Sequence, residues 1–198
     1  LGLLPDELLK PISEACKEVI EGKFNHQFLV DMIQGGAGTS VNMNANEVIA
    51  NRALELMGYE KGDYPHCSPN DHVNQSQSTN DAYPTTVKLA VIMMNKSLIK
   101  KLQLLIEVFR KKGQEFADVI KMGRTQLQDA VPMTLGQEFE AFAANLEEEI
   151  TRLQSNANLF LEINMGGTAI GTGLNAPKGY AKLCAENSAK LTGDAFVT

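Results

Sequence analysis

The chain has 198 residues and a net charge of −6, with 43% hydrophobic and 21% charged residues. This length can form one domain with a sizeable core, and the negative charge disfavours nucleic acid or an anionic membrane surface as the main partner. No apolar run approaches the roughly 20 residues that span a bilayer. The three cysteines, Cys16, Cys67 and Cys184, form no metal-ligand or disulfide pattern, which favours a reducing cytoplasm.

The first two predicted helices cover residues 5–21 and 43–57. The first begins with Pro5-Asp6-Glu7, a helix-start pattern, and its apolar spacing ends at Gly22. A Gly/Thr/Ser loop is predicted over residues 34–42, directly before the second helix. Residues 59–69 hold Gly and Pro at several positions and predict another loop.

Two much longer helices are predicted, over residues 79–116 and 135–160. In each, apolar residues recur at steps of three and four, which gives one apolar stripe per helix. Because globular helices average about 11–12 residues, this length predicts an all-α fold, a long-helix bundle with short irregular or strand-like segments in its loops. We expect other chains or further sequence to cover the stripes. A closing helix is predicted over residues 178–191.

The polar stretch from Ser68 to Thr86 leads into the first long helix. Ser78, Thr79 and Asn80 are good N-cap residues, and Pro84 suits a first helical turn. A helix start attracts anions, because its unpaired N–H groups and the helix dipole both point at the ligand. We therefore predict that this cluster holds a carboxylate of a small substrate. For an isolated Ser-Thr-Asn run, a simple helix cap is the commoner explanation.

Further support comes from four loops, each rich in Gly, Thr, Ser and Asn and each leading into a helix. Such loops can converge on one point in a bundle, and neutral donors suit a carboxylate whose charge grows during a reaction. The segment 121–134 is predicted as one of these loops, and 164–177 as another. The candidate donors are Thr39, Ser40, Ser78, Thr79, Asn80, Thr125 and Gln126, with Arg124 as the one cation among them.

No cofactor or metal site is predicted. Residues 35–40 lack the Gly-Lys-Ser/Thr ending of a nucleotide-binding P-loop, and residues 171–173 lack the third glycine of a dinucleotide fingerprint. The three histidines have no metal-ligand spacing. His72, beside Asp71, could carry a proton, although a structural histidine at a helix start is the commoner case. Cys67 has no neighbouring base in the sequence and is expected to be inert.

Three segments of the chain resemble the aspartase/fumarase lyases. They are Gly-Ala-Gly-Thr-Ser-Val-Asn-Met-Asn-Ala-Asn-Glu-Val (36–48), Pro-Asn-Asp-His-Val-Asn-Gln-Ser-Gln-Ser-Thr-Asn-Asp (69–81) and residues 122–138, which begin Met-Gly-Arg-Thr-Gln. Ser-Thr-Asn at 78–80 and Gly-Ala-Gly-Thr-Ser at 36–40 resemble the aspartase (aspartate ammonia-lyase) branch. Class II fumarases usually read Ser-Ser-Asn and Gly-Ser-Gly-Thr-Gln there. Gln126 replaces the His of fumarases, but some aspartases keep that His.

The resemblance implies reversible elimination of ammonia from L-aspartate to give fumarate, through an enediolate-type intermediate and without a cofactor. It implies a cytoplasmic homotetramer whose active sites are each shared by three subunits. Residues 1–78 would be the remainder of an N-terminal helical region, and residues 79–198 the first part of the central bundle domain. By the same resemblance, Thr39, Ser78 and Thr79 would grip the β-carboxylate, and Asn80, Thr125 and Gln126 would hold the amino group or the α-carboxylate side.

One departure from the family pattern limits the function expected of this chain. The mobile loop that supplies the serine base in the family, Gly-Ser-Ser with a downstream Met-Pro and Lys-x-Asn-Pro, does not occur in the sequence. We therefore expect a fragment lacking both ends of an enzyme, with binding residues but no catalytic base, and inactive by itself. The alternatives are a class II fumarase, which hydrates fumarate, and a non-catalytic helical bundle that serves assembly.

Overall fold

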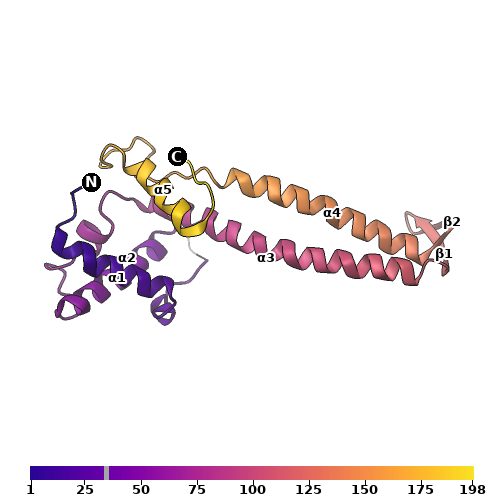
Figure 1. Ribbon diagram of the computed structural model, residues 1–198, viewed down its shortest axis with the longest axis horizontal. Helices are drawn as coiled ribbons and strands as arrows, with labels where there is room; N and C mark the ends of the chain where they lie inside the picture. Colours follow the sequence, from indigo (N-terminus) through magenta and orange to yellow (C-terminus); the bar gives the residue numbers. More distant parts are fainter. Residues whose placement is uncertain (34–35) are drawn as a thin grey trace. The chain divides into compact units, whose positions relative to one another are not determined.

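The computed structural model describes residues 1–33 and 36–198, and it confirms the predicted mostly helical fold (Figure 1). The chain forms two compact units, one of residues 1–88 with 161–198 and one of residues 89–160. The predicted domain boundary between residues 78 and 79 concerns a longer protein and stays a prediction. The helices are α1 (Asp6–Ile20), α2 (Thr39–Met57), α3 (Thr79–Glu115), α4 (Leu135–Leu159) and α5 (Tyr180–Thr192), and the strands are β1 (Ile120–Thr125) and β2 (Gln128–Thr134).

The core of the first unit lies between α1 and α2. Leu8 and Ala15 of α1 pack with Ala50, Ala53 and Leu54 of α2, and all five are buried. The small alanine side chains let the two helices approach closely, so that one large leucine from each helix fills the space between them. An ion pair between Arg52 of α2 and Glu18 of α1 also joins the two helices.

Helix α2 begins at Thr39, four residues before its predicted start, so the loop prediction for 34–42 is wrong from residue 39 on. Residues 34 and 35 of that loop lie outside the described residues. Gly38 caps α2 with a φ of 82°, and a Cβ there would overlap the ring of Tyr83 in α3. A glycine is therefore required where the starts of α2 and α3 meet. This tertiary contact overrides the weak helix propensity of Thr39 and Ser40.

In the second unit, the later part of α3 and α4 run antiparallel as a helical hairpin (Figure 1). Phe109 of α3 and Phe116, which follows the end of α3, contact Phe139 of α4, with ring centroids 5.9 and 5.7 Å apart. The Asn95 amide donates to the carbonyl of Leu153 over 3.1 Å. The observed helices agree closely with the predicted ranges 79–116 and 135–160.

The segment 121–134, predicted as a loop, forms the antiparallel hairpin of β1 and β2. Thr125 pairs with Gln128, so Gln126 and Leu127 make the two-residue turn. Thr134 then starts α4 with a capping box, in which its side chain and that of Gln137 each accept the other's backbone N–H. The expectation of strand-like segments in the loops is therefore confirmed here.

The apolar stripes of the second unit stay partly exposed in this chain. Met94 is 72% exposed, Leu98 47% and Leu105 40%. A monomeric protein rarely exposes such a continuous apolar surface, which agrees with the expectation that further helices cover it. Within residues 1–33 and 36–198, no helix combines the length and apolar character needed to cross a membrane.

Candidate functional site

The start of α3 is built around Ser78, which acts as its N-cap. The Ser78 hydroxyl oxygen accepts the N–H of Asn80 over 3.1 Å, and the Ser78 carbonyl accepts the N–H of Ala82 over 3.0 Å. The Ser78 N–H in turn donates to the Asp81 carboxylate over 2.8 Å. Of the three predicted caps, Ser78 therefore holds that position, and Thr79 and Asn80 already belong to the first turn.

Pro84 lies inside α3, past the first turn, so its predicted position is wrong. A proline has no N–H, and at this point the helix would need one to pair with the carbonyl of Asn80. The side-chain amide of Asn164 supplies that donor instead, over 2.8 Å. The Asn80 side chain donates in the opposite direction, to the carbonyl of Ala169 over 2.7 Å. Two side-chain amides thus join the start of α3 to the segment 164–175.

The buried side chain of Asp81 also joins the start of α3 to the segment 164–175. Its carboxylate is fully buried and accepts the N–H groups of Gly166 and Thr168 over 3.1 and 3.0 Å, besides that of Ser78. A buried carboxylate is stable only with such donors around it. Thr168 adopts a φ of 55°, which is rare for a β-branched residue. The bonds to Asp81 therefore compensate a backbone conformation that the segment would otherwise avoid.

Two ionisable groups of α5 lie near this carboxylate. Burial raises the pKa of the Tyr180 hydroxyl, and the negative charge of Asp81 raises it further. Burial also raises the pKa of the Cys184 thiol, which interacts with the Tyr180 hydroxyl through a hydrogen bond. Both shifts favour the neutral forms of these groups. Burial likewise raises the pKa of the Cys67 thiol, which disfavours the nucleophilic thiolate there.

On the α2 side, three asparagines form a chain of hydrogen bonds that ends at Thr79. The Asn42 amide donates to the Thr79 hydroxyl oxygen over 3.0 Å and to the Asn74 side-chain oxygen over 3.3 Å. Buried Asn46 donates to the same Asn74 oxygen over 3.0 Å. These residues were not predicted from the sequence. Asparagine is a poor helix former, so the spacing of Asn42, Asn44 and Asn46 around the predicted loop–helix boundary was the available signal.

A hollow of about 480 Å³ opens at the start of α3, within the first unit. Of the described residues that line it, none carries a charge. Within residues 1–33 and 36–198, the hydroxyl protons of Ser78 and Thr79 have no hydrogen-bond acceptor, whereas the Thr85 hydroxyl donates to the Asp81 carbonyl. The lining consists of Asn74, Gln77, Ser78, Thr79, Thr168, Ala169, Ile170, Thr172, Leu174 and Asn175. Two neutral hydroxyl donors are thus available at a helix start, as a bound carboxylate requires.

Four of the six predicted binding residues lie in the first unit, at the starts of two helices that touch. Thr39 opens α2, and Ser78, Thr79 and Asn80 open α3. The contact runs through Gly38 and Tyr83 and through the bond from Asn42 to Thr79. The structure therefore brings these two helix starts together.

Thr125 and Gln126 belong to the second unit, at the hairpin turn. Gln126 and Leu127 have φ values of 46° and 64°, the left-handed pair typical of a type I′ turn. Such turns favour Asn-Gly, so Gln-Leu here is strained, and retained strain of this kind marks functional segments. Arg124, the predicted cation, is paired across the hairpin with Asp129 over 3.0 Å.

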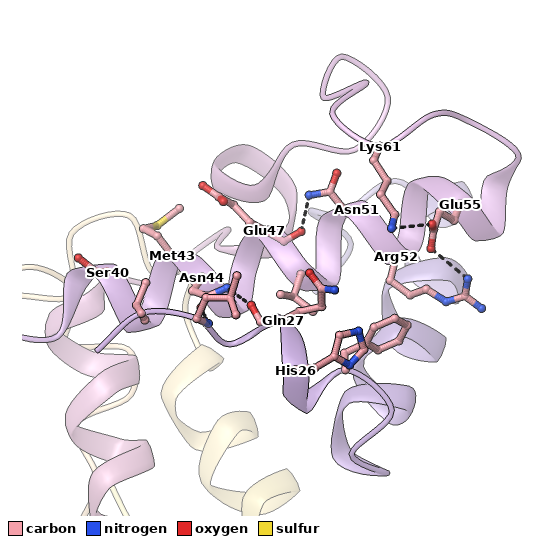
Figure 2. Close-up of a pocket in the computed structure, with 14 residues that line it drawn as sticks. His26, Gln27, Ser40, Met43, Asn44, Glu47, Asn51, Arg52, Glu55 and Lys61 are labelled. Carbon is pink, nitrogen blue, oxygen red and sulfur yellow. Dashed lines mark hydrogen bonds and ion pairs between the residues drawn. The ribbon is translucent and has the colours of Figure 1, made fainter. Parts of the chain in front are cut away.

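A second hollow, of about 610 Å³, lies between α2 and residues 24–30 (Figure 2). Its polar groups already bind one another. Glu55 accepts from both Arg52 and Lys61, and the Asn44 amide donates to the carbonyl of Gln27. Of the predicted donors, Ser40 lines it. Because Arg52 and Lys61 are already paired with carboxylates and the lining also carries Glu47, this hollow offers a carboxylate less than the start of α3 does.

A family model that describes lyases matches residues 1–198. The chain belongs to this lyase family. It is 59% identical to an aspartate ammonia-lyase of Pseudomonas aeruginosa, over 98% of this chain and 41% of that protein. It is 56% identical to an aspartate ammonia-lyase of Escherichia coli K12, again over 98% of this chain and 41% of the relative. The predicted resemblance is confirmed, and the chain spans about 41% of the length of these curated relatives.

Solved structures of the lyase family have the same fold. The crystal structure of fumarate lyase:delta crystallin from Brucella melitensis bound to cobalt matches with a TM-score of 0.92 and 55% identity, over 98% of this chain and 42% of that one. A class II fumarase from Schistosoma mansoni matches with a TM-score of 0.87 and 39% identity, over 97% and 40%. Both branches considered from the sequence are thus represented among the relatives.

Proposed function

We propose that the full-length protein of which this chain is a part catalyses the reversible elimination of ammonia from L-aspartate to give fumarate. The two aspartate ammonia-lyases support this activity, because they are 59% and 56% identical across 98% of the chain. The geometry at the start of α3 supports the substrate class. Among the residues that the structure describes, the hydroxyl protons of Ser78 and Thr79 have no acceptor, and both residues line an uncharged hollow at a helix N-terminus, which suits a carboxylate.

In this reaction a base removes a proton from the carbon beside the β-carboxylate, and the charge passes into that carboxylate before ammonia leaves. Thr39, Ser78 and Thr79 bind the β-carboxylate. Because its charge grows toward the enediolate, fixed neutral donors stabilise the transition state more than the substrate. Water would have to reorient to do the same, whereas the hydroxyls of Thr79 and Ser78 are held in place by bonds from Asn42 of α2 and Asn80 of α3.

The remaining three residues bind the other end of the substrate. Asn80, Thr125 and Gln126 hold the amino group or the α-carboxylate side. Asn80 already uses one amide hydrogen on Ala169, so its amide oxygen is the atom suited to an ammonium group. The serine base comes from sequence outside this chain, and the 198-residue chain alone is inactive.

The whole protein is a cytoplasmic homotetramer of amino-acid metabolism in which three subunits share each active site. The exposed apolar stripe that includes Leu98 and Leu105 supports assembly, since burial of such side chains contributes about 1.5–3 kcal/mol each. The match to the class II fumarase, at 39% identity, keeps fumarate hydration as a second candidate.

The test is a turnover assay of the full-length protein, with fumarate followed by its ultraviolet absorbance. L-Aspartate is expected to give fumarate far faster than L-malate does, and faster turnover of L-malate would favour a fumarase. Thr79→Val should lower kcat by about 10²–10³-fold, as loss of one such donor does. Thr86→Val is the matched control, because the Thr86 hydroxyl donates to the Tyr83 carbonyl of its own helix. Equal turnover by both variants would show that Thr79 does not bind the substrate carboxylate, and a wild-type protein without turnover would favour a non-catalytic assembly bundle.

A further inference from the structure

The hydroxyl of Thr79 differs from those of the other threonines near the start of α3. Thr85 and Thr86 donate their protons to the carbonyls of Asp81 and Tyr83, both over 2.7 Å. Thr79 is the first residue of α3, so no carbonyl of its own helix lies one turn before it. Among the described residues its hydroxyl only accepts, from Asn42.

This one bond decides the direction in which the Thr79 proton points. A hydroxyl has one proton and two lone pairs. When the Asn42 amide occupies a lone pair, the proton must turn away from that amide, which leaves it available to an acceptor in the hollow that Thr79 lines. The bond thus makes Thr79 a donor, which is the form that a carboxylate needs.

The orientation of Asn42 is itself fixed. Both of its amide hydrogens are used, one on Thr79 and one on the Asn74 oxygen, and Asn74 is held by buried Asn46. An amide with both hydrogens bound cannot turn its oxygen toward Thr79 without losing two bonds. The three asparagines therefore keep the NH₂ group, and not the carbonyl, directed at the hydroxyl.

We propose that Asn42 is a positioning residue that holds the Thr79 hydroxyl as a donor to the substrate carboxylate. The inference rests on the proposed function, because it requires a carboxylate in the hollow. Asn42 acts through Thr79 and makes no substrate contact of its own. Its contribution grows as the carboxylate gains charge, so its loss lowers kcat more than it changes KM.

Asn42→Asp in the full-length protein is the sharpest test, because it keeps the shape and replaces the donor with an acceptor. The Thr79 proton then turns to the new carboxylate and away from the substrate. We expect a loss of kcat on L-aspartate of about 10²–10³-fold, similar to that of Thr79→Val. Asn42→Ala, which removes the donor without adding a charge, should show a smaller loss.

The double variant separates positioning from a structural role. Once Thr79→Val has removed the hydroxyl, adding Asn42→Asp should cost less than threefold in kcat, since residues that act as one unit are not additive. Asn44→Asp is the matched control. It also removes an amide donor of α2, but this donor binds the Gln27 carbonyl. It should leave kcat within about threefold of the wild-type value, which corresponds to a change of about 0.65 kcal/mol in activation free energy.

Each outcome bears on one of the two proposals. Suppose that the wild type turns over L-aspartate, but the losses of kcat from Asn42→Asp and Thr79→Val are additive or Asn42→Asp causes no loss. The positioning role would then be wrong, and the proposed function would stand. If Asn42→Asp does not fold, as judged by its thermal melt, Asn42→Ala decides the question in the same cycle. Wild-type protein that neither turns over L-aspartate nor binds fumarate by calorimetry would refute the proposed function and this inference with it.

Discussion

The two units of the chain differ in the side chains that they bury and expose. Around the start of α3, the first unit buries the polar residues Asp81, Thr168 and Asn46, and all three are hydrogen-bonded. The second unit leaves large apolar side chains in water, with Met94 at 72% exposure. The first pattern is typical of a site with a fixed geometry, and the second of a surface that another helix covers. This difference agrees with the proposed carboxylate site in the first unit and with the proposed assembly surface in the second, which also carries the candidate residues Thr125 and Gln126.

The largest effect is expected from the buried carboxylate of the first unit. Asp81→Ala leaves the N–H groups of Ser78, Gly166 and Thr168 without an acceptor, and each orphaned buried donor costs about 1–3 kcal/mol. We expect a loss of about 3–5 kcal/mol in unfolding free energy together with activity, measured by urea denaturation and turnover of the full-length protein.

Asp71→Asn is the control for this change. The Asp71 carboxylate is exposed and accepts the Ser68 hydroxyl over 3.0 Å, so its substitution should shift stability by less than about 0.5 kcal/mol. Equal losses of unfolding free energy in the two variants would show that burial of Asp81 has no special role. The buried polar groups would then no longer distinguish the first unit from the second.

The assembly surface can be broken without touching the site. Leu98→Glu places a charge on the exposed stripe of α3, where Leu98 is 47% exposed in this chain. If a neighbouring subunit covers it, the change costs about 2 kcal/mol or more per contact, because a charge replaces buried apolar area. Sedimentation of the full-length protein should then show smaller species than the wild type does.

Lys101→Glu, on an exposed position of the same helix, tests whether charge alone is responsible. It should leave the oligomer intact. A Leu98→Glu protein that sediments like the wild type would mean that the stripe is not an interface, and the second unit would need another explanation for its exposed side chains.

A smaller, pH-dependent effect is expected at the ion pair between α1 and α2. The bond from Arg52 lowers the pKa of Glu18 below its ordinary value of 4.5. A carboxylate with a lowered folded-state pKa adds stability that is fully present above the unfolded pKa and is lost as pH falls through the folded one. Arg52→Gln should therefore reduce stability at pH 7 and flatten its decline below pH 4.5. Parallel acid-unfolding curves for the two proteins would contradict this.

The smallest effect is expected at the hairpin of the second unit. Leu127 has a φ of 64°, which costs an ordinary residue about 1–2 kcal/mol and glycine almost nothing. Leu127→Gly should therefore raise the melting temperature slightly and keep Gln126 in place. If activity falls while the melting temperature rises, the strained turn positions Gln126 for activity. If both stay unchanged, the strain has no role.

Most of the helical architecture could be predicted from the sequence, because long apolar periodicities identify α3 and α4 without reference to a partner. The start of α2 could not. Thr39 and Ser40 are weak helix formers, and only the contact of Gly38 with Tyr83 extends the helix to them. The hairpin was also missed, since Gln126-Leu127 is not a turn sequence.

The candidate site was partly predictable for a similar reason. Ser78, Thr79 and Asn80 are recognisable as cap residues within a single stretch. Asp81, Asn42 and Asn164 act through bonds to residues 32 to 87 positions away in sequence, and no local pattern reports such partners. The binding roles of Thr39, Thr125 and Gln126 rest on the resemblance to the lyase family and stay predictions.

The central claim is that neutral hydroxyls at the start of α3 receive a substrate carboxylate. A crystal structure of the full-length protein with bound succinate, a non-reactive C4 dicarboxylate, tests it most directly. We predict one carboxylate within about 3 Å of the hydroxyl oxygens of both Ser78 and Thr79. Succinate bound in the hollow beside Arg52 and Lys61 (Figure 2), with the start of α3 empty, would contradict the claim.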